Sequence, residues 1–501
     1  MTSQTFRPAA PMLASTGPLP RSTPSQQGVP AAAITGLLDA CAAARLELHS
    51  LMVLRHGHVV AEGWWEPYAP DELHLLYSLS KSVTATAVGL AVAEGLLGVD
   101  DLVVSFFPED VPADVHPYTA RMRVRHLLNM STGHREDTLD RLDRARVVAS
   151  FLALAPEEEP GTWFTYNNGA TMMLSAIVTR LTGVRLLDYL RPRLLEPLGI
   201  VDANWQGLGD EGGPGQMLLD LGFSGLHLAT ESVAKLGQLF LQRGTWHGQQ
   251  LVPAQWVDEA SRLQVDNPRE PNPDWRQGYG YQFWRGRRGY RGDGAFGQFC
   301  LVLPDEDTVV AITSATEDMQ VLLDCVWAEL LPALRHGDES GPQDVEVDSE
   351  SDDRLARRMA DLALPVASRA TSAAGSGLPW TRPAPLPVPQ RAPLTVDAIE
   401  EDDGGWQLTL ADEAATYVIS CGDGHWRRTD AEVRPGHVLR VAASGGWTSD
   451  TELTFELAMV QTPHRVTLVW DSATGWTTAG WNVAPLGITR ASQLALELAR
   501  G

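Results

Sequence analysis

The sequence predicts an α/β protein, in which an antiparallel sheet is sandwiched by helices beside a helical lobe and a smaller antiparallel all-β domain follows. Three observations support this prediction. Strand patterns lie at both ends of the segment before residue 336, with helical patterns around them. A Pro-rich stretch then interrupts the chain, and short alternating strands fill most of the remainder.

The first elements are an arm, a helix, a hairpin and a second helix. Residues 1–28 are rich in Pro, Ser and Gln, which is typical of a flexible arm. Residues 32–44 have the spacing of an amphipathic helix, and residues 49–65 predict two strands joined by a Gly-containing turn. Residues 78–94 predict a long apolar helix.

Further strands and a closing helix complete the first domain, which we expect to span residues 29–336. Residues 278–313 alternate as antiparallel strands with Gly-rich connections, and residues 319–334 have helical spacing. Residues 337–393 are first acidic, with a short charged helix, and then Pro-rich, as in a semi-rigid linker.

Residues 394–501 predict a small β-barrel or β-sandwich domain. This segment holds six tryptophans: Trp406, Trp426, Trp447, Trp470, Trp476 and Trp481. They could form aromatic platforms for carbohydrate, but we favour the interpretation that they fill the core of a domain with few other large apolar residues.

Charge and composition exclude several classes of function. The formal net charge of −24 argues against a nucleic-acid partner, which needs a basic face. Four cysteines lie far apart, without a disulfide or metal pattern, and the histidines add no metal motif, so we expect neither metal nor organic cofactor. The start of the chain lacks the pattern of a signal peptide and no apolar stretch could span a bilayer, so we expect a cytoplasmic protein without a membrane partner.

Lysine is almost absent from this sequence. Only Lys81 and Lys235 occur among the 39 basic residues, and the others are arginines. An arginine keeps its proton in proteins, whereas a buried lysine can become a neutral amine. The two lysines are therefore candidates for proton-transfer chemistry.

Each lysine follows a serine by three residues, which places the hydroxyl and the amine on one helix face. Ser78 enters an apolar helix, so Lys81 would be desolvated and could accept the serine proton. Ser232 instead lies at a helix start with capping residues, and we interpret Lys235 as a structural cation on a solvated face.

Two further motifs could complete a catalytic site. Tyr166 and Asn168 lie two residues apart after a Gly turn, so both side chains can face one cleft. A phenol beside a cationic lysine would have a lowered pKa and could transfer a proton, while the Asn168 amide could bind substrate. Gly294 and Ala295 head a strand, where the Ala295 N–H could join that of Ser78 in an oxyanion hole. A satisfied strand tyrosine and a tight hairpin are the alternative interpretations.

The order of these motifs resembles the serine β-lactamase-related superfamily. SLSK, VRHLLNMSTGH, GTWFTYNN, SGLHLATESVAKLGQLFL and GAFGQ follow one another between about residues 30 and 335. This superfamily includes class C β-lactamases, DD-peptidases, family VIII esterases and nylon-oligomer hydrolases. The resemblance implies that Ser78 is the nucleophile, Lys81 its base, and Tyr166 and Asn168 the family Tyr-x-Asn pair. The GAFGQ form is most similar to the nylon-oligomer hydrolase and esterase branch.

The sequence departs from that pattern on one strand. Gly292 and Asp293 stand where many relatives carry the Lys (or His) and Thr of a Lys-Thr-Gly or His-x-Gly triplet. Glycine cannot anchor a carboxylate and Asp293 would repel one, although Arg288 or Arg291 could substitute. We therefore predict a serine hydrolase for a small-molecule ester or amide rather than a β-lactamase or D-amino-acid peptidase. A non-catalytic binding protein on the same fold is the remaining alternative.

Overall fold

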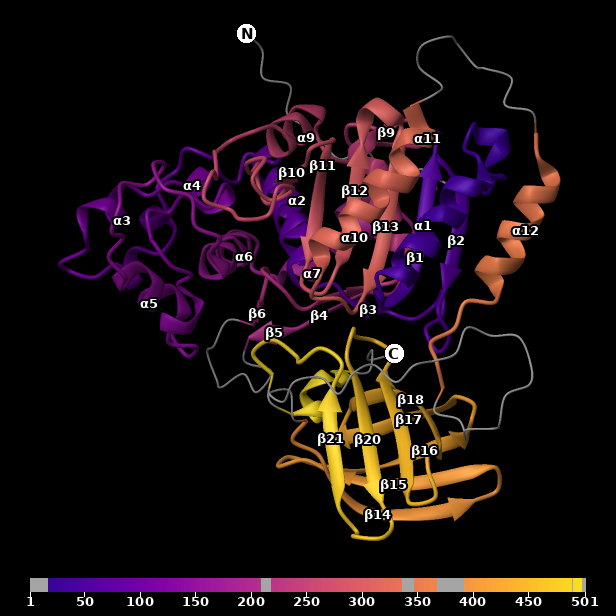
Figure 1. The fold of residues 1–501 in the computed structure, drawn as a ribbon. Coiled ribbons are helices and arrows are strands. Elements are labelled where there is room, and N and C mark those ends of the chain that lie inside the picture. The colour runs from indigo at the N-terminus through magenta and orange to yellow at the C-terminus, as the bar shows by residue number, and fades with distance from the viewer. Residues whose placement is uncertain (1–16, 209–217, 336–346, 367–391, 489, 498–501) are drawn as a thin grey trace.

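The computed structural model describes residues 17–208, 218–335, 347–366, 392–488 and 490–497. It contains two domains, an α/β domain and below it in Figure 1 a curved β domain. The predicted fold class is confirmed.

A six-stranded sheet forms the centre of the first domain, in the order β10-β11-β12-β13-β1-β2, with every pair antiparallel. Its strands are β1 Leu48–Arg55, β2 His58–Trp64, β10 Trp284–Arg285, β11 Tyr290–Gly294, β12 Gln298–Leu303 and β13 Thr308–Ser314. β1 and β13 are buried along their whole length and lie side by side in register, Val53 opposite Val310. The two ends of the domain sequence therefore meet in the middle of the sheet.

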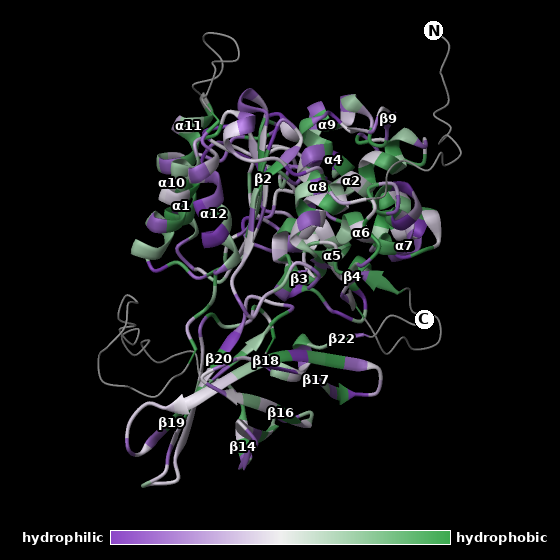
Figure 2. Cartoon of the chain, turned by 90° about the vertical axis from the view of Figure 1, so that its right-hand side faces the viewer, coloured by the Kyte–Doolittle hydropathy of each residue, from purple (hydrophilic) through white to green (hydrophobic). Residues whose placement is uncertain are grey.

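Helices cover both faces of this sheet. One face carries α1 (Ala31–Ala43), α10 (Met319–Cys325), a π-helical turn (Val326–Leu330), α11 (Leu331–Arg335) and α12 (Ser349–Ala360). In Figure 2, α2 (Ser80–Ala93), α6 (Asn168–Thr182) and α8 (Thr230–Leu241) lie on the opposite side. α2 contacts β11 on one side and α6 on the other, so it joins the sheet to the helical lobe.

The lobe and its connections contain shorter elements. Its other helices are α3 Pro117–Arg121, α4 Val124–Leu128, α5 Val147–Ala153, α7 Leu186–Leu190 and α9 Ala254–Ser261. Its short strands are β3 His74–Leu75, β4 Asn204–Trp205, β5 Gly207–Leu208, β6 Leu219–Asp220, β7 Leu226–Leu228, β8 Thr245–Trp246 and β9 Gln249–Gln250. No single helix in the described part of the chain is long and apolar enough to cross a bilayer.

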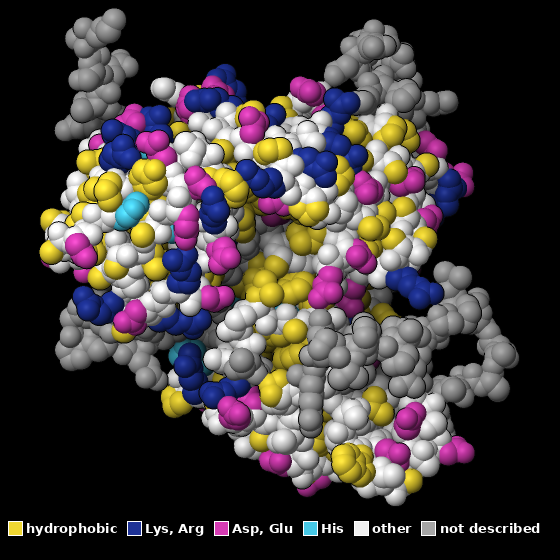
Figure 3. All heavy atoms as spheres, turned by 60° about the vertical axis from the view of Figure 1, so that its left-hand side comes forward, with side chains coloured by type: hydrophobic (Ala, Val, Ile, Leu, Met, Phe, Trp, Pro, Cys, Tyr) yellow, Lys and Arg dark blue, Asp and Glu magenta, His cyan; other side chains and the backbone are white. Residues whose placement is uncertain are grey.

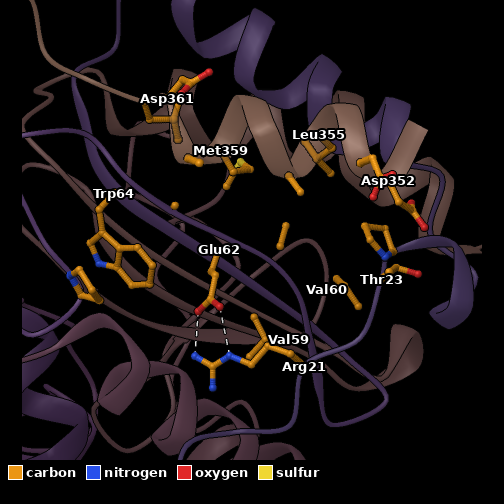
Figure 4. Close-up of a pocket in the computed structure, with 18 of the residues that line it drawn as sticks. Arg21, Thr23, Val59, Val60, Glu62, Trp64, Asp352, Leu355, Met359 and Asp361 are labelled. Atoms are coloured by element: carbon orange, nitrogen blue, oxygen red, sulfur yellow. Dashed lines mark hydrogen bonds and ion pairs between the residues drawn. The ribbon is translucent and has the colours of Figure 1, made fainter. Parts of the chain in front are cut away.

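Residues 17–28, part of the segment predicted as a flexible arm, contact the first domain through Arg21. Arg21 forms a parallel bridge to the edge strand β2, and its guanidinium lies 2.8 Å from carboxylate oxygens of both Glu62 and Glu231. Figure 4 shows Arg21 and Glu62 pointing toward each other. These backbone and ionic contacts fix residues 17–28 on the first domain. The Pro-rich composition of the segment does not predict them.

The predicted linker over residues 337–393 also contains a packed helix. α12 lies against α1 and β2, and its apolar side chains Leu355 and Met359 are buried. A cavity of about 850 Å³ lies between α12, β2 and the N-terminal segment (Figure 4). β2 is the edge of the sheet opposite β10 and β11, so this cavity is separate from the site described below.

The C-terminal domain is one curved, mostly antiparallel sheet, a half-barrel rather than a sandwich. Its strands are β14 Thr395–Asp402, β15 Gly405–Ala411, β16 Thr416–Asp423, β17 Arg427–Arg434, β18 His437–Trp447, β19 Glu452–Met459, β20 Arg465–Asp471, β21 Thr477–Trp481 and β22 Leu496–Glu497. Trp406 and Trp481 are buried in its core, and Trp447 and Trp470 pack against it. Only Trp476 of the six tryptophans is largely exposed, so the core-filling interpretation holds for most of them.

The two domains are packed together through a polar interface. Glu72, which is buried, accepts hydrogen bonds from Arg428 and Arg440 of the β domain. Glu47 pairs with Arg465, whose Nη2 lies 2.6 Å from the carboxylate. Buried and bidentate arginine contacts of this kind fix orientation as well as proximity. The β domain is therefore docked on the first domain and not merely tethered to it.

Candidate active site

Ser78 and Lys81 lie where the chain enters α2. Ser78 is in a single 3₁₀ turn (Tyr77–Leu79) directly before this helix, and it is half-buried. Lys81 lies in the first turn of α2 and is only 1% exposed. Its Nζ is 2.8 Å from the Ser78 Oγ, so the predicted pairing of serine and lysine is present.

Two more oxygen atoms surround the Lys81 amine. Asn168 Oδ1 is 2.7 Å from Nζ, and the backbone carbonyl oxygen of Phe223 is 3.0 Å away. Burial lowers the pKa of Lys81 to about 7, against the smaller opposing effects of Asp137 and Asp293. A substantial fraction of neutral amine is therefore present near neutral pH.

The orientation of the Asn168 amide is fixed by Asp137. Asn168 opens α6, and its backbone N–H and its Nδ2 donate to the two carboxylate oxygens of Asp137 at 2.8 and 2.6 Å. Because the carboxylate accepts from the amide nitrogen, the amide oxygen must face Lys81. Sequence analysis missed Asp137 and the Phe223 carbonyl, since neither belongs to a motif that contains serine, lysine or tyrosine.

Tyr166 lies over the same lysine, but its predicted acidity is wrong. The Lys81 Nζ is 4.6 Å from the centre of the Tyr166 ring, which stacks on Trp284. Burial and the nearby Asp293 carboxylate raise the pKa of Tyr166 well above its usual range, although a hydrogen bond with Ser78 acts the other way. The phenol is therefore neutral and can donate a proton, but it does not ionise readily.

Gly294 and Ala295 lie at the turn between β11 and β12, next to the segment that precedes Ser78. A Cβ atom on Gly294 would lie 2.0 Å from the Leu76 carbonyl oxygen, and one on Gly292 would lie 2.8 Å from the Ser82 Oγ. The glycines thus let β11 approach the start of α2 closely. Ala295 accepts from Gln298 at its carbonyl, and no described residue accepts from its N–H.

Asp293 and Arg291 form a buried ion pair on β11. Arg291 Nε lies 3.0 Å from the Asp293 carboxylate, and the two side chains are 2% and 6% exposed. Burial raises the pKa of Asp293, and Arg291 opposes that effect. Asp293 therefore already balances the charge of Arg291. This argues against the prediction that Arg291 takes the place of the missing carboxylate-binding residue.

Lys235 is not the solvated cation that the sequence suggests. It is only 5% exposed, and its Nζ lies 3.5 Å from the Gly199 carbonyl oxygen. Its helix, α8, packs on β12 and β13. Its structural role remains the interpretation we favour, but in a buried setting.

Among the described residues, no group of three or more His, Cys, Asp or Glu side chains could hold a metal ion. The space-filling view shows a hollow between the two domains in which hydrophobic side chains gather (Figure 3). The polar cluster around Ser78 brings together a serine hydroxyl, a buried amine and a phenol.

Comparison with known proteins identifies the class to which this site belongs. Residues 31–325 match the family model described as Beta-lactamase, which covers more than half of the chain. The chain belongs to the Beta-lactamase family, and the resemblance inferred from its motifs is confirmed.

Individual relatives are distant. The chain is 24% identical to the 6-aminohexanoate-dimer hydrolase of Paenarthrobacter ureafaciens over 298 residues, which are 54% of this chain and 73% of that protein. It is 24% identical to the lovastatin esterase of Penicillium rubens over 165 residues, 28% of this chain and 41% of that protein. The solved structure of a penicillin-binding protein homologue from Caulobacter crescentus is similar to this chain with a TM-score of 0.50 and 19% sequence identity. The match covers 62% of this chain and 99% of the homologue, and it shows the fold.

Proposed function

We propose that this protein is a serine hydrolase that cleaves an ester or amide bond of a small molecule through an acyl-enzyme on Ser78. The arrangement around the Lys81 amine carries the proposal. Asn168 Oδ1 and the Phe223 carbonyl can only accept hydrogen bonds, so they take the two N–H groups of a neutral amine. The remaining lone pair then faces the Ser78 hydroxyl at 2.8 Å.

Acylation follows from this arrangement. The Ser78 Oγ attacks the substrate carbonyl carbon and gives its proton to the Lys81 lone pair. The carbonyl oxygen becomes negative, and we expect the backbone N–H groups of Ser78 and Ala295 to stabilise it. As the bond to the leaving group breaks, the neutral Tyr166 phenol donates its proton to that group and regains one from the Lys81 ammonium.

Deacylation repeats these steps with water. A water molecule attacks the acyl carbon, and its proton passes to the neutral amine of Lys81. The bond to the Ser78 Oγ then breaks, the Lys81 ammonium returns the proton to the serine oxygen, and the acid leaves. No metal or organic cofactor enters either step.

The substrate we propose is a neutral ester or amide. Asp293 stands in β11 at the position where a carboxylate-binding residue would be needed, and Arg291 already neutralises it. Two relatives that the chain resembles are named a 6-aminohexanoate-dimer hydrolase and a lovastatin esterase, which supports hydrolysis of a small molecule. We expect p-nitrophenyl butyrate to be turned over faster than nitrocefin or D-alanyl-D-alanine peptides; comparable kcat/KM values would favour the β-lactamase or peptidase alternative.

Labelling with a fluorophosphonate probe, followed by peptide mapping, tests the proposal. The expected result is one labelled peptide that contains Ser78, and loss of label in Ser78→Ala. Label on Ser80 or Ser232 would contradict the assignment. Absence of label together with absence of turnover would favour the non-catalytic binding alternative.

A further inference from the structure

The C-terminal β domain reaches the residue that precedes the nucleophile. The phenol oxygen of Tyr77 lies 2.6 Å from the Nε2 of His464, which is 387 residues further along the chain. His464 is fully buried and Tyr77 is 5% exposed. This is a direct contact between the 3₁₀ turn that contains Ser78 in the first domain and a side chain of the second.

The hydrogen-bond partners of His464 show which group donates in this contact. The His464 Nδ1 lies 2.9 Å from the Val483 carbonyl oxygen, which can only accept, so Nδ1 carries the hydrogen and Nε2 is bare. Tyr77 therefore donates its O–H to His464. Burial lowers the pKa of His464 to about 4 and raises that of Tyr77, so both groups stay neutral around pH 7.

The backbone of Tyr77 adopts an unfavourable conformation. Its φ is +47°, in the left-handed region, which is unfavourable for a non-glycine residue. Phe296, directly after Ala295, has a φ of +66°. Such conformations persist only where surrounding contacts fix them.

His464 contacts both of these residues. Its ring centre is 5.8 Å from that of Tyr77 and 5.6 Å from that of Phe296, edge-on in each case, and the Tyr77 and Phe296 rings are 5.4 Å apart. Tyr77 precedes Ser78 and Phe296 follows Ala295, so one imidazole packs beside both halves of the proposed oxyanion hole.

We propose that His464 is a positioning residue, through which the C-terminal domain holds Tyr77 and thereby fixes Ser78 and the oxyanion hole. This inference rests on the proposed hydrolase function. The surrounding interface supports it, because the Leu75 N–H donates to the Gln461 carbonyl at 2.8 Å and Val483 packs with Tyr77 and Phe296. The β domain is then part of the catalytic unit.

A double-mutant cycle in the full-length protein tests this role. We expect His464→Leu and Tyr77→Phe each to lower kcat about tenfold, the upper range for one hydrogen bond, with KM within twofold. The double variant should be no slower than either single variant, because both remove the same hydrogen bond. His464→Gln, whose side-chain oxygen can accept from Tyr77, should recover most of the activity.

Tyr68→Phe is the matched control. Tyr68 also crosses the interface, donating to the Thr462 carbonyl at 3.1 Å, but it does not contact Tyr77. Tyr68→Phe should keep the wild-type kcat, although its melting temperature should change by about as much as that of His464→Leu. Unchanged kcat in His464→Leu, or multiplicative losses in the double variant, would overturn the inference.

A structural readout separates this inference from the proposed function. If the wild type shows no Ser78-dependent turnover, the hydrolase proposal fails first. Crystal structures of wild type and His464→Gln and His464→Leu variants then decide the positioning role. We expect the Leu variant alone to shift Tyr77 and lengthen the Ser78 Oγ to Lys81 Nζ distance; an unmoved Tyr77 would overturn it.

Discussion

The chain contains two Ser-x-x-Lys strings, and their surroundings differ more than their sequences do. Ser78 with Lys81 and Ser232 with Lys235 each lie near the start of a helix, and both lysines are buried. Lys81 has three oxygen atoms within 3.0 Å of its Nζ, whereas Lys235 has the Gly199 carbonyl oxygen at 3.5 Å. The spacing brings serine and lysine to one helix face, but hydrogen-bond acceptors from other segments surround the amine of Lys81 closely and that of Lys235 only at 3.5 Å.

The largest expected effect separates the two serines. Ser78→Ala should abolish turnover of p-nitrophenyl butyrate, because it removes the nucleophile, with little change in melting temperature. Ser232→Ala should keep wild-type activity. Steady-state kinetics and thermal unfolding of both variants measure this, and activity that survives in Ser78→Ala would remove the distinction between the strings.

The next effect separates the two lysines while conserving charge. Lys81→Arg should lower kcat by about 100-fold or more, in the range of losing a general base, because arginine does not give up its proton. Lys81→Met controls for the bulk of arginine and should be equally slow. Lys235→Arg should leave kcat unchanged but destabilise the buried α8 contact by about 1–3 kcal/mol through overpacking. Equal activity in Lys81→Arg and wild type would contradict the mechanism.

A smaller effect tests the carboxylate beside each lysine. Asp137→Asn should lower kcat about tenfold, because one amide cannot accept both hydrogen bonds from Asn168. The negative charge of Asp137 raises the pKa of Lys81, so its removal lowers that pKa. Since the base must be deprotonated, the acidic limb of kcat/KM should move to lower pH.

Glu231→Gln is the matched change beside Lys235, because Glu231 raises the pKa of that lysine in the same way. Its pH profile should overlay that of the wild type. An acidic limb that stays in place in Asp137→Asn, or moves in Glu231→Gln, would show that the limb does not report Lys81.

The parts of the site that sequence could predict are those set by local spacing. Ser78 and Lys81 lie one helical turn apart, and Tyr166 and Asn168 two residues apart, so their proximity follows from the backbone. Asp137 could not be predicted, because only the tertiary fold brings it to the Asn168 amide.

Two errors in the sequence predictions have a common physical cause. The pKa of Tyr166 was expected to fall beside a cationic lysine, and Lys235 was expected on a solvated face. Both expectations omitted burial. Burial raises the pKa of Tyr166, and it removes the Lys235 side chain from solvent. In the same way, the composition of residues 17–28 does not show that Arg21 pairs with Glu62 and Glu231.

The most direct test of the central claim is the protonation of Lys81 itself. The chain has only two lysines, so protein labelled with ¹³C at lysine Cε should give two signals, and Lys235→Arg assigns them. We predict that the Lys81 signal titrates with a pKa of about 7. Titration at its ordinary value of 10.5 would contradict the account, because the Ser78 hydroxyl would then face an ammonium and not a base.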